Sequence, residues 1–218
     1  DVPEAELPYE PNLYEENRPN RFAYTVDVTT EAEPQRLNME GTVYLMSWSP
    51  SGERLAVTVA PSPEVDDFYM AQSVVLVDPE SGDVVADINN EGKIGQIEWS
   101  PSGDRLALRA GNDLHDTTDG RIMVVDAEDN ATPENIFPEF EGKFEQIAWT
   151  GDDTIHFLAS ESVETSFGTI APNGTDFTRR VELGGPILTG FAPTETGEVA
   201  FTAHTPAHPP EVFWLDAE

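Results

Sequence analysis

Apolar and polar residues alternate along most of this chain, in short segments separated by turn-forming residues. Such alternation indicates strands, whose side chains point to two faces in turn, and not helices, in which apolar residues recur every three or four positions. The first clear stretch predicts strands at 43–49, 55–60, 73–78 and 84–88. Pro50-Ser51-Gly52 between the first two is typical of a tight hairpin, because proline fixes φ and glycine tolerates φ > 0.

The pattern repeats. The ten residues of 48–57, Trp-Ser-Pro-Ser-Gly-Glu-Arg-Leu-Ala-Val, recur almost letter for letter at 99–108. Weaker copies begin at Trp149 and Phe191, so the four anchors lie 51, 50 and 42 residues apart. Repeats of about 40–50 residues with four strands each are typical of β-propeller blades. We therefore expect an all-β fold, a partial β-propeller of about four four-stranded antiparallel blades.

The later copies follow the plan of the first. Strands are expected at 94–99, 106–109, 122–126 and 135–137 in the second copy, at 144–149, 155–159, 167–171 and 177–183 in the third, and at 187–191, 199–202 and 212–215 in the fourth, which lacks an outer strand. The expected organisation is an irregular N-terminal arm at 1–21, a partial blade at 22–38, blades at about 42–90, 92–140 and 143–184, and a partial blade at 186–218.

Charge narrows the choice of partners. The chain has 42 Asp and Glu against 11 Lys and Arg, a formal net charge of −31, and its two lysines are Lys93 and Lys143. Such a surface repels phosphates and anionic lipids, so neither nucleic acid nor a membrane is an expected partner. An even excess of carboxylates keeps a protein hydrated in concentrated salt, where a Debye length of about 3 Å screens their repulsion. We therefore expect a salt-adapted source.

Cysteine and apolar runs exclude further classes. The chain has no cysteine, which excludes disulfides, thiol catalysis and cysteine-based metal sites. No apolar run approaches the roughly 18 residues that a spanning helix needs. No signal peptide is visible, although a chain that begins at Asp1 is compatible with a processed product.

No catalytic residue can be assigned. A serine hydrolase of the α/β type places its nucleophile in Gly-x-Ser-x-Gly, and this pentapeptide does not occur in the sequence. The four histidines, His115, His156, His204 and His208, have no serine placed beside them by any motif. His156 lies in a predicted strand, where its side chain is expected to face a blade surface or a cavity. We expect no catalytic residue and no cofactor in this chain.

His204 and His208 have the i, i+4 spacing of some zinc sites. Those sites use the spacing on a helix, where the two side chains share one face. Here the segment is His-Thr-Pro-Ala-His-Pro-Pro, and so many prolines exclude a helix. We expect a rigid extended loop and no metal.

Two acidic segments could in principle hold calcium. They are Asp113, Asp116, Asp119 and Gly120 in one loop, and Glu64, Asp66 and Asp67 in another. Neither has the ligand spacing of an EF-hand. We expect solvated loops between strands and no metal site.

Three tryptophans and two asparagines complete the candidates. Trp48, Trp99 and Trp149 recur at the repeat period, which favours packing between blades over ligand binding. Asn130 and Asn173 each begin a glycosylation sequon, a pattern short enough to arise by chance, and Asn173 lies in an expected turn.

The repeated Trp-Ser-Pro-Ser-Gly-(Glu/Asp)-Arg-Leu-Ala resembles the blade motif of prolyl oligopeptidase-family propellers and of TolB-type periplasmic propellers. The segment 202–216, Thr-Ala-His-Thr-Pro-Ala-His-Pro-Pro-Glu-Val-Phe-Trp-Leu-Asp, is similar to a stretch of acylaminoacyl-peptidase-like members. The general resemblance covers about 22–216. It implies a propeller that sits over an α/β-hydrolase domain and restricts access to large substrates. The sequence carries none of that domain, so no catalytic residue transfers.

The resemblance leads to two expectations of function. The first is the non-catalytic propeller portion of a serine peptidase, acylaminoacyl- or dipeptidyl-peptidase-like, that gates substrate access and scaffolds the absent hydrolase domain. The alternative is a stand-alone TolB- or WD-repeat-like module that binds a protein. A propeller enzyme with its own active site is a third possibility. It is disfavoured because the inner strands show no cluster of unusual polar residues.

Partners and location follow from the same reading. Expected partners are the hydrolase domain or remaining blades of the parent protein and, through the parent, peptide substrates. Open blade edges also favour self-association, because each blade buries its faces against its neighbours. A periplasmic or secreted location is favoured over a cytoplasmic one.

Overall fold

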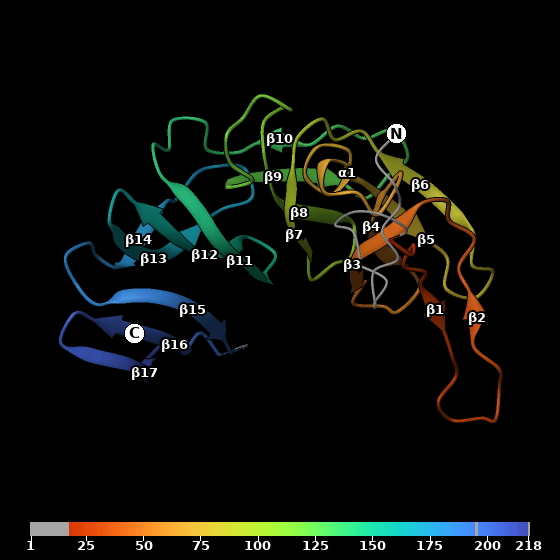
Figure 1. Cartoon of the computed structure of the whole chain (residues 1–218). Coiled ribbons are helices and arrows are strands. Elements are labelled where there is room, and N and C mark those ends of the chain that lie inside the picture. The colour runs from red at the N-terminus through yellow and green to blue at the C-terminus, as the bar shows by residue number, and fades with distance from the viewer. Residues whose placement is uncertain (1–17, 195, 218) are drawn as a thin grey trace, which may run out of the picture.

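The chain folds into a fan of antiparallel sheets that forms part of a β-propeller (Figure 1). The computed structural model describes residues 18–194 and 196–217, so most of the arm expected at 1–21 lies outside the described residues. A two-stranded sheet, β1 (Tyr24–Thr25) and β2 (Gln35–Arg36), comes first. The remaining sheets are named blades 1 to 4 in chain order.

Each blade is a meander, in which every strand pairs with the next one along the chain. Blade 1 contains β3 (Thr42–Trp48), β4 (Leu55–Ala60), β5 (Ser73–Val77) and β6 (Val84–Ile88). Blade 2 contains β7 (Ile94–Trp99), β8 (Arg105–Ala110), β9 (Arg121–Asp126) and β10 (Glu134–Asn135). Blade 3 contains β11 (Lys143–Gly151), β12 (Thr154–Glu161), β13 (Glu164–Ile170) and β14 (Thr178–Val181). Blade 4 has three described strands, β15 (Ile187–Pro193), β16 (Val199–Thr205) and β17 (His208–Leu215).

The blades are joined through their first strands and share a core between their faces. β3 contacts β7, β7 contacts β11, and β11 contacts β15. Each main apolar cluster combines side chains of two neighbouring sheets, as where Phe167 of blade 3 packs edge-on against Phe191 and Phe201 of blade 4. Because both faces of an interior sheet are covered, the middle of its second strand carries buried side chains on both faces. β12 is almost continuously buried, whereas the end strand β17 is exposed.

Three details differ from the expectations. Residues 65–70, expected in a loop, form the short helix α1 (Val65–Met70) between β4 and β5. The outer strands β10 and β14 are shorter than the segments 135–137 and 177–183, because an outer strand has a partner on one side only.

The fourth repeat also begins at a different residue. Pro193 lies opposite Val199, as Trp149 lies opposite Ile155. Pro193, and not Phe191, therefore occupies the tryptophan position. The alignment was wrong because an aromatic residue was matched with tryptophan, while strand pairing aligns Phe191 with Ile147.

The repeated tryptophans and arginines tie one blade to the next. The Trp99 indole Nε1 donates a 2.9 Å hydrogen bond to the backbone oxygen of Ser47 in blade 1. Arg54 of blade 1 lies 5.2 Å over the Trp99 ring, and Arg105 lies 5.1 Å over that of Trp149. The expected packing between blades is thus confirmed for Trp99 and Trp149. Trp48, which has no preceding arginine of this type, is 55% exposed.

Glutamines on the inner strands form a second tie. The Gln96 side-chain amide donates to the backbone oxygen of Ile147 at 2.7 Å and accepts from its N–H at 3.0 Å. Gln146 makes the same two contacts with Phe191, one blade further on. Strand pairing places Leu45 at the corresponding position of blade 1. The joint between blades 1 and 2 therefore lacks this pair of hydrogen bonds.

Candidate functional site

The histidines are not arranged for nucleophilic catalysis. His156 is buried and stacks on Phe167 with ring centroids 5.6 Å apart. His204 and His208 lie in the hairpin of β16 and β17, which replaces the expected extended loop, because the turn at 206–207 lets the two strands pair. In the part of the chain that the structure describes, no histidine side chain hydrogen-bonds a serine. Of the two expected positions of His156, a blade surface or a cavity, the structure shows the first: the ring packs on Phe167 within the core.

The acidic loop 111–120, between β8 and β9, is built by ion pairs and is not simply solvated. Asp113 accepts hydrogen bonds from the backbone N–H groups of His115 and Asp116, which closes a turn. Asp116 lies 3.1 Å from Arg121 Nε. Burial opposes its ionisation, but hydrogen bonds from Asn112, Arg121 and Thr118 together hold its pKa below the ordinary value.

Each carboxylate of this loop therefore turns towards a different partner. Within residues 18–194 and 196–217, no group of three or more His, Asp or Glu side chains is arranged to hold a metal ion. The second acidic segment begins α1, where Asp66 and Asp67 occupy the first turn and Asp67 accepts a hydrogen bond from Ser62 at 2.6 Å. That segment is therefore not an open loop.

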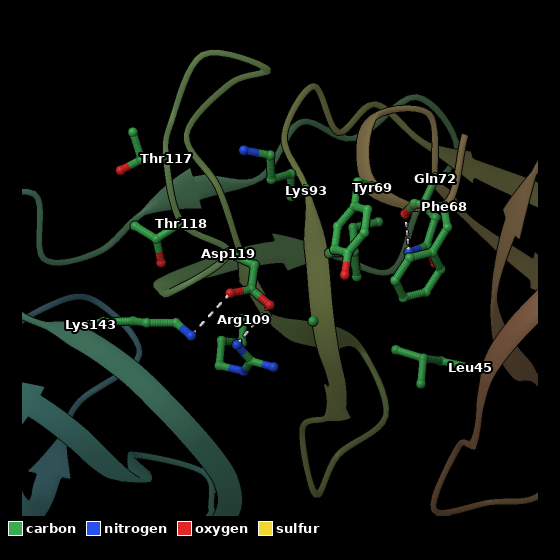
Figure 2. A pocket seen from close by; sticks show the side chains of 12 residues that line it. Leu45, Phe68, Tyr69, Gln72, Lys93, Arg109, Thr117, Thr118, Asp119 and Lys143 are labelled. Atoms are coloured by element: carbon green, nitrogen blue, oxygen red, sulfur yellow. Dashed lines mark hydrogen bonds and ion pairs between the residues drawn. The ribbon is translucent and has the colours of Figure 1, made fainter. Parts of the chain in front are cut away.

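A cavity of about 480 Å³ lies between loop 111–120, α1 and the inner strands (Figure 2). Its lining residues are Leu45, Phe68, Tyr69, Gln72, Lys93, Ile94, Gly95, Arg109, Thr117, Thr118, Asp119 and Lys143. Blades 1, 2 and 3 all contribute. Three of these residues are basic and one is acidic, in a chain whose net charge is −31. Both lysines of the chain are among them.

The basic side chains are fixed by specific partners. Arg109 Nη1 lies 2.8 Å from Asp119 Oδ2, and Lys143 Nζ lies 3.5 Å from Asp119 Oδ1. Lys143 also contacts Glu145 at 3.0 Å, and Lys93 donates to the backbone oxygen of Asp116 at 2.6 Å. Arg109 Nε is buried and finds no hydrogen-bond partner among the described residues. The guanidinium therefore has donor capacity that Asp119 does not use.

Two departures from the repeat make room for the cavity. At Leu45, blade 1 lacks the glutamine that fills the corresponding joint elsewhere. At Gly95, a Cβ would overlap the Asp119 carboxylate and the Arg109 guanidinium. Because glycine has no side chain, the Arg109–Asp119 pair can lie directly against the inner strand.

Aromatic rings form the opposite wall. Phe68 and Tyr69 of α1 face the cavity, and Tyr69 is 56% exposed (Figure 2). The same two rings border a second cavity of about 580 Å³, whose lining includes Arg18, Arg21 and Tyr44. Arg21 lies 5.2 Å over the Tyr44 ring, and Tyr44 packs on Phe68 at 4.7 Å. Five of the eleven basic residues of the chain thus line two adjoining cavities.

Sequence reasoning missed this cluster. The inner strands were expected to carry no set of unusual polar residues, and of this cluster Lys143 lies on one, while Arg109 of β8 and Asp119 of loop 111–120 meet it beside β7. A signal was present at Arg109, since the equivalent residues of blades 1 and 3 are Thr58 and Leu158. The gathering itself depends on contacts between blades, which a repeat pattern does not reveal.

Comparison with known proteins identifies the fold. No protein-family model and no curated protein matches this chain. Among solved structures, a putative TolB from Agrobacterium tumefaciens superposes with a TM-score of 0.59 at 16% identity, over 91% of this chain and 71% of that one. A puromycin-hydrolysing peptidase of Mycobacterium tuberculosis gives 0.59 at 16% identity, over 84% of this chain and 29% of the peptidase.

A structure from a study of two prolyl endopeptidases gives a TM-score of 0.55 at 16% identity, over 79% of this chain and 25% of that one. This chain therefore spans most of the TolB structure and about a quarter of each peptidase. The described helix, α1, is too short and too polar to cross a membrane. The chain has an all-β propeller fold, similar to TolB-type propellers and to parts of prolyl-type peptidases.

Proposed function

We propose that this chain is the non-catalytic propeller portion of a prolyl oligopeptidase-type serine peptidase, where it limits the access of peptide substrates and supports a hydrolase domain. The observation that carries the proposal is the exposed ring of Trp48. Its counterpart Trp99 packs under an arginine of the preceding blade and hydrogen-bonds that blade. The two peptidase structures show the same fold over four fifths or so of this chain. The two-stranded sheet β1–β2 already packs on that side of blade 1, and the exposed Trp48 marks where the inner strands of a complete blade would lie.

The repeat specifies the chemistry of the missing blade. Arg54 and Arg105, which cover a tryptophan, each precede the first apolar residue of a second strand. In blade 4 the residue before Val199 is Glu198, which accepts hydrogen bonds from Thr194 and Thr196. If blade 4 of a second copy of this chain packed beside blade 1, it would therefore have no arginine to place over Trp48. The partner that fits is a blade with the Ser-Gly-x-Arg hairpin, supplied by the parent protein.

The exposed strand β17 supports the same proposal. It carries the segment that resembles acylaminoacyl-peptidase-like proteins, and Val212, Phe213 and Trp214 are exposed on it. In a complete propeller, an outer strand and a further blade would cover these side chains.

The test uses the complete product of the gene that encodes this chain. We expect it to hydrolyse short acylated or dipeptidyl substrates and to reject long or folded ones. In acrylamide quenching, replacing Trp48 by Phe should then remove little of the accessible fluorescence, because a blade covers that ring. The matched substitution Trp99→Phe reports a ring that is buried in either case.

A complete product without peptidase activity overturns the proposal. If Trp48 is nevertheless protected from quenching, the TolB- or WD-repeat-like binding module is the better account. The observation that favours this alternative is the TolB likeness, which covers 91% of this chain and most of the TolB structure. A periplasmic or secreted location belongs to either proposal.

A further inference from the structure

We propose that the cavity between loop 111–120 and α1 binds a peptide through a carboxylate that neighbours an apolar side chain. The inference rests on the proposed role of the propeller in handling peptides, but not on the presence of a hydrolase domain. It assigns a ligand chemistry to three lining residues, Lys93, Lys143 and Tyr69.

The placement of charge is the first argument. The chain has few basic residues, and a random surface position is far more often acidic. In the cavity lining, Lys93, Arg109 and Lys143 outnumber the carboxylates, even when Glu145, which pairs with Lys143, is counted together with Asp119. A partly enclosed cavity strengthens the field of such charges, because solvent screens them less than on an open surface. An anion is therefore attracted here and repelled by most of the remaining surface.

Donor geometry is the second argument. Asp119 shows that a carboxylate is accommodated between Arg109 and Lys143, at 2.8 and 3.5 Å. An ammonium group has three donors, and Lys93 uses one in its described contact with the backbone oxygen of Asp116. Lys143 uses two, on Asp119 and Glu145, so each lysine keeps a donor for a second carboxylate beside Asp119. Figure 2 shows both lysine side chains at this cavity.

Asp119 also selects the charge of the ligand. Together with Glu145 it leaves the three cations an excess of one positive charge, which a singly charged carboxylate balances and a doubly charged phosphate exceeds. A polyanion is disfavoured for the same reason, and it would in addition face the net charge of −31.

The apolar wall determines what is attached to the carboxylate. Leu45 is 36% and Tyr69 is 56% exposed, and both border the cavity together with Phe68. Exposed aromatic and aliphatic groups beside cations favour an amphipathic ligand, whose apolar part leaves water on binding. A C-terminal carboxylate next to an aromatic side chain has this chemistry, and so does a glutamate next to one.

Isothermal titration calorimetry with blocked dipeptides tests the inference. The probes are acetyl-glycyl-phenylalanine, its C-terminal amide, and acetyl-glutamyl-phenylalanine amide, in about 1 M potassium chloride, where a Debye length of roughly 3 Å suppresses long-range repulsion. We expect the free acid to bind at least tenfold more tightly than the simple amide. Binding of the glutamyl amide at the affinity of the free acid would assign the site to acidic side chains, and weaker binding to C-termini.

The variants separate this cavity from general charge effects. Lys93→Gln with Lys143→Gln should weaken binding of the free acid at least tenfold, and Tyr69→Ala should weaken it severalfold. Arg36→Gln removes one positive charge on β2, outside the cavity, and should leave binding within twofold of the wild type, whereas each single lysine variant, with the same charge change, should weaken it. Thermal unfolding of each variant verifies that it is folded.

Three results would overturn the inference: equal binding of acid and amide, wild-type affinity of a folded double lysine variant, or tighter binding of inorganic phosphate than of the free acid. Each of these can occur whether or not the complete gene product is a peptidase. Conversely, loss of the peptidase proposal leaves the titration result unaffected.

Discussion

At the scale of single residues, His156 shows how the packing of blades controls a titratable group. Its ring lies on Phe167, and its Nδ1 is buried without a hydrogen-bond partner among the described residues. Burial, and then the positive charge of Arg180, lower the pKa of His156 below its ordinary value of 6.5. The folded chain therefore holds this histidine neutral at a pH where the unfolded chain already binds a proton.

This difference predicts that acid destabilises the fold through His156. Below about pH 6.5 the unfolded state takes up the proton first, so the free energy of unfolding falls by at most about 1.4 kcal/mol per pH unit until the folded pKa is reached. Above that window the contribution is constant. His156→Leu should remove this contribution to the pH dependence of the free energy of unfolding. Urea unfolding between pH 5 and 7 measures it as the difference between the two proteins, and parallel pH profiles would contradict the prediction.

At the scale of elements, the joints between blades differ in strength. The joints between blades 2 and 3 and between blades 3 and 4 each have a glutamine that donates to and accepts from one backbone residue. Losing such a side chain leaves an N–H and a C=O without partners in a poorly solvated joint.

We therefore predict that Gln96→Ala lowers the free energy of unfolding by about 1–3 kcal/mol. The matched change Gln35→Ala removes a hydrogen bond to Glu80 at an exposed site and should cost less than about 0.5 kcal/mol. Denaturant titrations of the two variants provide the comparison. Equal costs would mean that the Gln96 contacts do not hold the blades together.

The elements also show where prediction from sequence succeeds. Strands are set by local alternation and by hairpins such as Pro50-Ser51-Gly52, so the first three strands of blade 1 lie close to their expected positions. Helix α1 was missed, because a six-residue helix between two strands leaves little periodic signal. The cavity was missed for a different reason. Lys143 and Asp119 lie 24 positions apart in the sequence and meet only because blade 3 packs on blade 2.

At the scale of the whole molecule, charge dominates. The structure describes few ion pairs, which leaves most of the 42 acidic side chains to repel one another. Self-repulsion favours the expanded chain, and its range is set by the Debye length, about 10 Å at 0.1 M salt and about 3 Å at 1 M. A salt-adapted source remains our proposal for this composition.

Salt should therefore stabilise the fold. Raising potassium chloride from 0.1 to 1 M is predicted to raise the melting temperature by roughly 5 °C, which corresponds to one or two kcal/mol for a chain of this size. Differential scanning calorimetry measures the change. Sucrose of matched osmolality serves as the uncharged control and should have a smaller effect. A melting temperature that stays constant or falls with salt would contradict this account of the acidic surface.

The leucine at the joint between blades 1 and 2 has a consequence for how such a chain can evolve. The repeat supplies a default residue for this position, as Gln96 and Gln146 show, and Leu45 departs from it. A cavity has thus opened where a structural contact was given up, and its walls come from α1 and loop 111–120, which replace the two-residue connection 162–163 of blade 3. Since Leu45→Gln would restore the default residue against Ile97, a single substitution separates the present joint between blades 1 and 2 from one that carries the repeated glutamine contact.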